Sequence, residues 1–439
     1  MCQTGAKMAT YRQAVQYISE IPKFTKKNCP EHTKAFLHAL GDPQDSLKVI
    51  HVAGTNGKGS VCSCIDVMLR AEGKRTGLFL SPHLVRMNER IVIDGQEISD
   101  DDFAAVYETV LEQVHELEKQ GIPHPTFFEF LFGMAVYAFA EAGVEYAVLE
   151  TGLGGRLDAT NCVEHPVCSV ITSIGMDHTR YLGDTLEKIA GEKAGIFKRG
   201  VPAYYIEGKE ESNRTIERKA AELGISCKKV RKNAFKILEI TEKSIAFSCA
   251  DAYYGDVTWI LHNTGLYQVE NTMLALEVMR GILGEYGHPK LWRDALAESV
   301  WTGRMEEVAP GVYADGAHNP DAVERFAQSV AGRRGIGILF SAVEDKDYAE
   351  MIRCLCEEVD ADFYVVTHIT DRRAADAATL AGLFGKYTDR PVIVKESLRD
   401  AWDYCMEHQE GRNIYCIGSL YLVGMIREFL DHIEEELSC

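Results

Sequence analysis

This sequence lacks the features that would assign it at once to a membrane, secreted or fibrous class of protein. Its longest apolar stretch runs only from Phe130 to Ala140, directly after Glu129, which is too short to cross a bilayer. The first ten residues lack the apolar core of a secretory signal. There are no internal repeats and no low-complexity segments. With 46% hydrophobic and 26% charged residues, the chain has the composition of an ordinary globular protein with no membrane partner.

The chain also lacks an excess of positive charge and a cysteine framework. Its formal net charge of −19 argues against nucleic acid as a partner, although a local basic pocket still allows an acidic small substrate. The thirteen cysteines occur singly or as Cys62-x-Cys64 and Cys354-x-Cys356, with no Cys-x-x-Cys pair. This pattern is typical of free thiols in a reducing compartment and predicts a cytoplasmic protein.

A glycine-rich turn joins an apolar strand, Val49–Val52, to a helical pattern that starts near Ser60. The turn reads Gly-Thr-Asn-Gly-Lys-Gly-Ser over residues 54–60. The common P-loop pattern would have glycine in place of Val52 and would have Ser or Thr directly after Lys58. The physical requirements for phosphate binding are still met, because the turn offers backbone N–H groups, a lysine and a helix N-terminus. The sequence therefore predicts a phosphate site.

Polar residues follow four successive predicted strands of this region, at Ser60, Ser81, Glu150 and His178. Strands that alternate with helices predict a parallel, doubly wound sheet, and ligands of such sheets gather at the carboxyl ends of the strands. Glu150 is therefore either a Mg²⁺ ligand beside the phosphate or a solvated loop acid. His178 is either a hydrogen-bonded core histidine or a contact to metal or phosphate.

A chain of 439 residues exceeds a comfortable single core, so we expect two domains. Residues 1–298 are predicted to form the P-loop-containing α/β domain, with a mostly parallel sheet. Alternating apolar residues within 228–263 predict small antiparallel hairpins appended to that sheet. Residues 299–304 are predicted to be a hinge, and residues 305–439 a second, smaller, Rossmann-like α/β domain.

Two further positions are ambiguous from their own surroundings. Asp315, in Asp-Gly-Ala-His-Asn-Pro, ends the first predicted strand of the second domain. It is either part of a turn or an acceptor for ribose hydroxyls. Lys193 lies on a predicted helix that starts at Leu186, where a lysine by itself indicates a solvated side chain.

The motifs occur in one order over most of the chain: GTNGKGS (54–60), SPHLVRMNERI (81–91), TFFEF (126–130), ETGLGGRLDATN (150–161), TSIGMDHTRYLGDTLEKIAGEKAGIF (172–197), GR (303–304), DGAHNP (315–320) and GSLYLVG (418–424). As a set they closely resemble the folylpolyglutamate synthase/dihydrofolate synthase family, within the Mur-ligase-type amide ligases. The resemblance implies ATP-dependent, Mg²⁺-assisted addition of L-glutamate to a reduced folate or folylpolyglutamate, through an acyl phosphate. It also explains the altered phosphate loop, which is this superfamily's own form.

The resemblance assigns roles to individual residues. Nucleotide contacts fall on Gly57, Lys58, Gly59, Ser60, Asn271, Arg304 and Asp315. Mg²⁺ ligands fall on Ser60, Ser81, Glu150 and His178. Lys193 matches a lysine that is carbamylated in this family, and His318 lies in the same motif as Asp315. Because the nucleotide contacts fall on both sides of the predicted hinge, we expect the second domain to close over ATP. The folate pocket falls on Thr126, Phe127, Phe128, Glu129, Leu157, Asp158 and Ala159.

The sequence departs from the family pattern at several places. Asn28-Cys29-Pro30-Glu31-His32 replaces a frequent Gly-Leu-Glu-Arg, which leaves the use of dihydropteroate open. Thr302 replaces a usual proline, Tyr267 a frequent histidine and Thr151 a frequent valine. None of these changes removes a proposed ligand.

Two alternatives differ from a folate ligase. One is a Mur-type enzyme for a cell-wall precursor, but the roughly 50 residues before the phosphate loop leave no room for its extra uridine-nucleotide domain. The other is a nucleotide-binding regulatory protein without ligase activity, which the presence of Lys58, Glu150, His178 and Lys193 disfavours. We expect the chain to act as a monomer.

Overall fold

The computed structural model describes residues 9–22 and 30–438, and contacts group the chain into two compact units. The N-terminal unit contains the described residues up to 174 together with residues 182–234 and 271–296. The C-terminal unit contains residues 175–181, 235–270 and 297 onward. The predicted boundaries at residues 298 and 304 stay a prediction. Contacts assign the segment 235–270 to the C-terminal unit, and a hydrogen bond from Asn263 to the Arg304 carbonyl is one of the ties that hold it there.

The N-terminal unit is built on a mostly parallel sheet whose strand order is β4-β3-β2-β5-β1-β6-β7-β8. The strands from β2 through β5, β1, β6 and β7 to β8 pair in parallel, and β3 and β4 add an antiparallel edge beside β2. In chain order the strands are β1 (Lys48–Ala53), β2 (Thr76–Phe79), β3 (Ile91–Ile93), β4 (Gln96–Glu97), β5 (Tyr146–Glu150), β6 (Cys168–Ile171), β7 (Ala203–Ile206) and β8 (Cys227–Val230). The predicted doubly wound sheet is confirmed.

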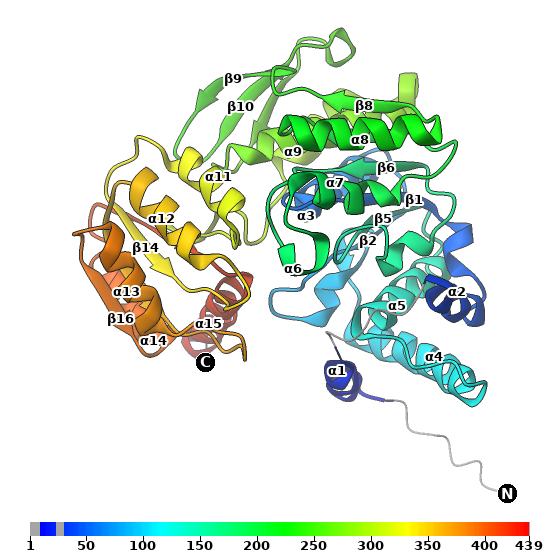
Figure 1. Cartoon of the computed structure of the whole chain (residues 1–439), viewed down its shortest axis with the longest axis horizontal. Helices are drawn as coiled ribbons and strands as arrows, with labels where there is room; N and C mark the ends of the chain where they lie inside the picture. The colour runs from blue at the N-terminus through cyan, green and yellow to red at the C-terminus, as the bar shows by residue number, and fades with distance from the viewer. Residues whose placement is uncertain (1–8, 23–29, 439) are drawn as a thin grey trace, which may run out of the picture. The chain divides into compact units, whose positions relative to one another are not determined.

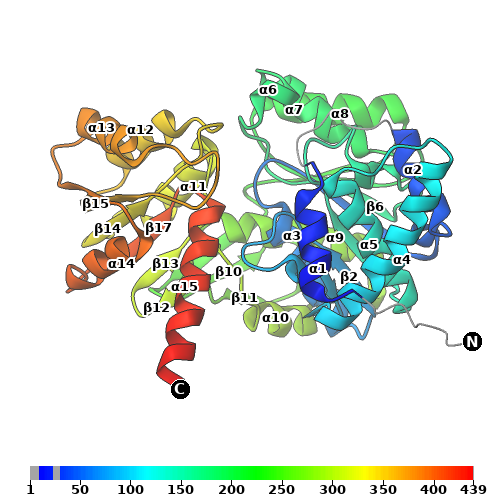
Figure 2. The same cartoon turned by 90° about the horizontal axis from the view of Figure 1, so that it is seen from below.

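Helices follow the strands as the alternation predicts, and α4 and α5 lie side by side (Figures 1 and 2). They are α1 (Tyr11–Glu20), α2 (Pro30–Ala39), α3 (Lys58–Ala71), α4 (Asp100–Lys119), α5 (Phe127–Glu141), α6 (Thr179–Leu182), α7 (Leu186–Lys193), α8 (Glu210–Leu223), α9 (Tyr267–Leu283) and α10 (Pro289–Ala297). On one face of β1, Val49 packs into the apolar cluster of α4 and α5, and Ala53 into that of α7 and α8. His51 lies between them on the same face.

The segment 228–263 differs in part from the expectation. Its first residues continue β8, which pairs in parallel with β7, so they belong to the large sheet. The remainder forms a separate three-stranded antiparallel sheet in the order β11-β10-β9, and none of its strands pairs with a strand of another sheet within the described residues. Its strands are β9 (Phe235–Ile240), β10 (Ile245–Cys249) and β11 (Thr258–Leu261), with a register shift between Ala246 and Phe247. The predicted antiparallel strands are present, but the prediction that they are appended to the large sheet is wrong, because alternation cannot say which sheet a strand joins.

The C-terminal unit has a six-stranded sheet in the order β12-β13-β17-β14-β15-β16, parallel except for the edge strand β12. Its strands are β12 (Glu306–Ala309), β13 (Val312–Ala314), β14 (Ile336–Phe340), β15 (Ala361–Thr367), β16 (Val392–Lys395) and β17 (Asn413–Ile417). The helices are α11 (Pro320–Val330), α12 (Tyr348–Glu358), α13 (Ala377–Tyr387), α14 (Leu398–Glu407) and α15 (Leu420–Ser438). Figure 2 shows α12 and α13 on one side of β14 and β15 and α14 on the other, which agrees with two separate apolar clusters.

No helix within residues 9–22 and 30–438 is both long and apolar enough to cross a membrane. Ten cysteines fall in this part of the chain, and all of them are free thiols. Cys2, Cys29 and Cys439 lie outside it.

Candidate active site

The phosphate loop leaves β1 at Ala53 and enters α3 at Lys58. Gly57 has a φ of 85°, a left-handed conformation that favours glycine, and a Cβ there would lie 2.3 Å from Asn271 Oδ1. Lys58 occupies the first turn of the helix, and its Nζ donates to the Thr55 carbonyl at 3.2 Å. The Ser60 hydroxyl is buried and has no hydrogen-bond partner among the described residues. The loop thus carries a cation and an unused hydroxyl at a helix N-terminus.

Glu150 ends β5 beside this loop, because Glu150 and Val52 of β1 are partners in the parallel register. Its Oε2 accepts from the Ser81 backbone N–H at 3.0 Å, and its Oε1 lies 3.9 Å from Lys58 Nζ. The carboxylate is only 5% exposed, and a Cβ at Gly59 would lie 3.5 Å from it. The alternative of a solvated loop acid is therefore wrong.

Lys193 is at the end of α7, and its surroundings contradict the interpretation of a solvated helix lysine. The residue is 4% exposed, and its Nζ donates to the carbonyl of Gly54 in the phosphate loop at 2.6 Å. Helical periodicity could not show this, because the neighbour is 139 residues away in the sequence. Only the family resemblance singled out this position.

The residues predicted to form the folate pocket surround the start of α5 and the loop after β5. Thr126 caps α5, and Glu129 returns the contact by accepting from the Thr126 N–H at 2.8 Å. Phe128 packs so closely on Gly152 that a Cβ there would lie 2.7 Å from its ring. Phe127 has the Arg90 guanidinium over its ring at 5.4 Å.

Within the same pocket segment, Leu157 is 43% exposed and Ala159 starts a short 3₁₀ turn. Asp158 between them is 6% exposed and accepts from the Leu153 N–H at 2.8 Å. Of the segment in which the sequence departs from the family, Asn28 and Cys29 lie outside the described residues. His32, at the end of that segment, has its Nε2 2.6 Å from the Pro123 carbonyl oxygen and its Nδ1 3.9 Å from Glu129 Oε2.

In the C-terminal unit, His178 is held beside a buried ion pair that sequence analysis missed. The pair joins Asp177 Oδ1 to Lys346 Nζ at 2.5 Å, and both side chains are less than 10% exposed. Asp177 also accepts from Asn319 Nδ2 at 3.1 Å and from the backbone N–H of His178 at 2.7 Å. His178 has a φ of 49°, and its side chain is 38% exposed. Lys346 could have been found from the sequence, since it lies in the loop after β14, which ends at Phe340, and ligands of such sheets gather at strand ends.

Electrostatics in this cluster favour a charged Asp177 and a neutral His318. Burial by itself would raise the pKa of Asp177, but the charge of Lys346 and the hydrogen bond from it outweigh burial and hold the pKa well below its ordinary value. His318 Nε2 lies 3.8 Å from Asp177 Oδ2. Burial and then Lys346 lower the pKa of His318, although 24% of its side chain stays exposed, which moderates the effect of burial.

Asp315 follows β13 and is 3% exposed. Its Oδ2 accepts from the Tyr267 hydroxyl and from the Met305 N–H at 2.9 Å, and its Oδ1 accepts from the Ala317 N–H at 2.8 Å. Burial raises the pKa of Asp315. Arg304 is next to Met305, with one guanidinium N–H donated to the Gly303 carbonyl at 2.8 Å. These hydrogen bonds show Asp315 as a turn residue, and its role as a ribose acceptor stays a prediction.

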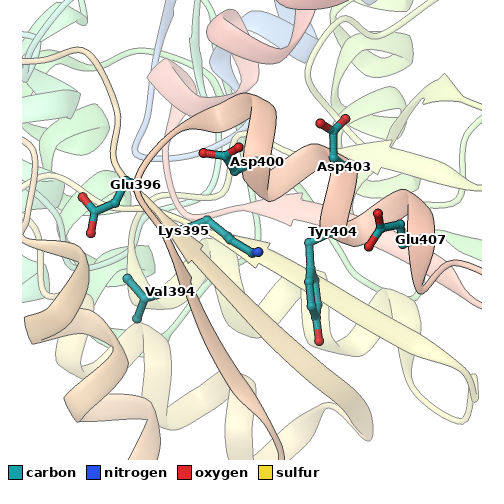
Figure 3. A pocket seen from close by; sticks show the side chains of 7 residues that line it. All are labelled: Val394, Lys395, Glu396, Asp400, Asp403, Tyr404 and Glu407. Carbon is teal, nitrogen blue, oxygen red and sulfur yellow. The ribbon is translucent and has the colours of Figure 1, made fainter.

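A cavity of about 340 Å³ lies elsewhere in the C-terminal unit, where β16 ends and α14 begins (Figure 3). It is lined by Val394, Lys395, Glu396, Asp400, Asp403, Tyr404 and Glu407. None of the predicted site residues is among them. The candidate site is therefore defined by the strand ends described above and not by this acidic cavity.

Comparison with protein families identifies two domains in the chain. Residues 104–279 match the Mur ligase middle domain, and residues 303–420 match the Mur ligase glutamate ligase domain.

Individual relatives match over nearly the whole length. A dihydrofolate synthase/folylpolyglutamate synthase of Bacillus subtilis is 34% identical, over 96% of this chain and 99% of its own. The structure of Mycobacterium tuberculosis folylpolyglutamate synthase with ADP and AMPPCP has a TM-score of 0.85 at 31% identity, over 95% of this chain and 98% of that one. The structure of E. coli FolC with DHPP and ADP has a TM-score of 0.83 at 28% identity, over 97% and 99% of the two chains.

Proposed function

Because this chain belongs to the folylpolyglutamate synthase/dihydrofolate synthase family of Mur-type ligases, we propose that it is an ATP-dependent ligase that adds L-glutamate to folates. The observation that carries the proposal is the meeting of Lys58, Glu150 and Lys193 at one phosphate loop. The cell-wall alternative has less support, since relatives that match 96% of this chain, from Bacillus subtilis and Lacticaseibacillus casei, are named as folylpolyglutamate synthases.

The chemistry requires that a carboxylate be activated, because an amine cannot displace oxide from it. The γ-phosphoryl group of ATP is transferred to a folate carboxylate, which gives an acyl phosphate and ADP. The amine of glutamate then attacks the carbonyl carbon and loses a proton. The tetrahedral intermediate expels phosphate and leaves an amide. A site for this reaction must neutralise phosphate charge and hold the two reactants in line.

The phosphate loop suits the nucleotide in this reaction. Gly57, Gly59 and Ser60 would offer backbone N–H groups to the phosphates, and Lys58 would supply positive charge. Asn271 of α9, whose Oδ1 would lie 2.3 Å from a Cβ at Gly57, would contact the nucleotide beside the loop. In the C-terminal unit, Arg304 and Asp315 would contact the rest of the nucleotide, with His318 in the same motif.

The residues near the loop also fit Mg²⁺. The buried Ser60 hydroxyl without a partner and the buried Glu150 carboxylate are oxygen donors of the kind that this hard cation prefers. We propose Ser60, Ser81, Glu150 and His178 as the residues that hold it. Bound there, the ion would reduce the charge repulsion among the phosphate oxygens. Arg90 donates to Ser81 Oγ at 3.1 Å and orients that hydroxyl.

Lys193 is proposed to be carbamylated. Its amine would add to CO₂ and release a proton, so that a carboxylate replaces a buried cation next to the phosphate loop. Intact-protein mass after trapping of the carbamate with a methylating reagent would detect the modification, and Lys193→Arg would remove it.

The folate would bind where Thr126, Phe127, Phe128, Glu129, Leu157, Asp158 and Ala159 surround the start of α5. This pocket combines two aromatic rings with two buried carboxylates, at Glu129 and Asp158, and a pterin ring has flat faces that match the rings and N–H donors that match the carboxylates. The half-exposed Leu157 would be covered by the substrate.

One assay tests the whole proposal. The purified protein is given ATP, Mg²⁺ and L-glutamate with either tetrahydrofolate or dihydropteroate, and ADP release and product mass are followed. We expect ADP release that depends on glutamate and a product heavier by one glutamate residue. Absence of product with both acceptors would contradict the proposal, and the pair of acceptors tells which folate form is used. The monomeric state and the cytoplasmic location stay predictions.

A further inference from the structure

A buried chain of three polar side chains leads from the centre of the large sheet to the pocket carboxylate Asp158. His51 Nε2 lies 2.8 Å from Thr160 Oγ1, and Thr160 Oγ1 lies 2.7 Å from Asp158 Oδ1. His51 and Thr160 are fully buried, and Asp158 is 6% exposed. Sequence analysis singled out only the last of the three.

The direction of each hydrogen bond follows from chemistry. A carboxylate only accepts, so the Thr160 hydroxyl must give its proton to Asp158. The same oxygen then accepts from His51, which must carry its proton on Nε2. Burial, and then the charge of Lys198, lower the pKa of His51 to about 3, so the ring is neutral near pH 7. The remaining ring nitrogen, Nδ1, then carries no proton and is an acceptor, and it is buried without a hydrogen-bond partner among the described residues.

These contacts leave Asp158 with little freedom. Its Oδ1 accepts from the hydroxyl and, at 3.2 Å, from the backbone N–H of Thr160, and its Oδ2 accepts from the Leu153 N–H at 2.8 Å. A carboxylate has about four acceptor positions, so about one is left, on Oδ2. Asp158 is thus fixed in one orientation with one acceptor position to offer.

The position of His51 costs stability that packing does not explain. On β1 it lies between Val49 and Ala53, which pack into two different apolar clusters. A buried nitrogen without a partner is unfavourable at such a place, where an apolar side chain would avoid the cost. Groups that break local rules in this way are expected where they serve a site.

We propose that Thr160, and behind it His51, are positioning residues that aim the free acceptor of Asp158 at an N–H donor of the substrate's pterin ring. This inference rests on the proposed function. The chain of three side chains starts at His51 on β1, the strand that leads into the phosphate loop. A residue of the nucleotide-binding strand therefore sets the geometry of the folate pocket.

Steady-state kinetics of the full-length enzyme test it, with ATP and glutamate saturating and the folate varied. Thr160→Val keeps the shape but removes the hydroxyl, and we expect the folate KM to rise about tenfold, as for the loss of one oriented hydrogen bond to a charged group. The KM for ATP and kcat should change less than about twofold on the same reasoning. Thr160→Ser restores the hydroxyl and should restore the folate KM. His51→Leu should also raise the folate KM. His51→Gln, whose side-chain amide can donate a hydrogen bond to Thr160, should raise it less.

Two controls separate positioning from general destabilisation. Thr215→Val removes another buried hydroxyl of the N-terminal unit, one that bonds the Glu211 carbonyl, and it should leave the folate KM unchanged. An aminobenzoyl-glutamate without the pterin ring, used as a competitive inhibitor, should bind wild type and Thr160→Val equally. The inference would be overturned if Thr160→Val raised the KM for ATP as much as the KM for folate, or if it left the folate KM unchanged. It would also be overturned if Thr160→Ser and Thr160→Val had the same folate KM. Absence of any folate-dependent turnover in the wild type would instead overturn the proposed function.

Discussion

The two units hold their charged site residues in different ways. In the N-terminal unit, Lys58 and Lys193 donate to backbone carbonyls, and Glu150 accepts from a backbone N–H. In the C-terminal unit, the buried charge of Asp177 is held mainly by other side chains, with Lys346 as the charged partner. Side chains that bond to backbone groups, as in the N-terminal unit, keep their places only if the backbone keeps its path. Side chains that bond to one another, as around Asp177, keep their places only if every partner is present. The site of the N-terminal unit should therefore be sensitive to substitution of its loop glycines, and the Asp177 cluster to the loss of a single charged side chain.

The largest effect is expected from Asp177→Ala. Removing one member of a buried pair leaves Lys346 buried without its counter-charge, which costs about 3–5 kcal/mol of unfolding free energy. Denaturant unfolding of the full chain measures it. The double variant Asp177→Ala/Lys346→Met should recover part of the loss. If Asp177→Ala lowered the unfolding free energy by less than about 1 kcal/mol, the range of exposed ion pairs, the C-terminal unit would not depend on this side-chain pair as argued.

A second test addresses Glu150 of the N-terminal unit. Glu150→Ala should reduce kcat by more than the roughly 10–100-fold that is typical for loss of a partner outside the metal's own ligands. Folate affinity should change little, because Asp158 and the aromatic rings remain. Glu150→Gln keeps the shape without the charge and should be nearly as slow. Near-normal turnover of either variant would refute the assignment.

Gly57→Ala probes the backbone path itself. The new Cβ would lie 2.3 Å from Asn271 Oδ1 at a φ of 85°, so the loop must shift. We expect the KM for ATP to rise about tenfold, equivalent to about 1.4 kcal/mol. Gly73→Ala is the matched control, since Gly73 has a φ of 70° but no neighbour within 4 Å of the new Cβ. Both variants should lose stability because of the left-handed φ, Gly57→Ala the more because of the clash with Asn271, and only Gly57→Ala should lose ATP affinity.

The smallest effect concerns pH. The pKa of His318 is lowered in the folded state, so between that value and about 6.5 the unfolded chain binds the extra proton and stability falls with falling pH. We expect a loss of about 1 kcal/mol between pH 7 and pH 5.5, measured by denaturant unfolding. His318→Gln should abolish that loss. The lowered pKa of Asp177 adds a separate loss only below about pH 4, where its unfolded carboxyl protonates.

Sequence reasoning located the strand ends well. The strand predicted at Val49–Val52 lies within β1, and Glu150 ends β5 beside the phosphate loop, as the parallel order requires. Apolar runs bounded by turn residues carry this information locally.

The partners of side chains were beyond the same reasoning. Asp177 and Lys346 are 169 residues apart, and His51 and Thr160 are 109 apart, so no local pattern connects them. The burial of Lys193 was missed for the same reason. Periodicity shows which way a side chain faces but not what lies opposite.

The small sheet β11-β10-β9 has a consequence for the behaviour of the chain in concentrated solution. Its two outer strands have unpaired backbone edges within the described residues, and Leu238, Ile240 and Ile260 are 40% to 51% exposed there. Such edges invite strands of other molecules. The register shift interrupts the regular pairing of β9, and exposed Lys236 and Glu239 stand among its apolar residues, which opposes continuous pairing with another chain. Both features belong to β9, so we expect the β11 edge, with exposed Ile260, to be the more open of the two to another strand.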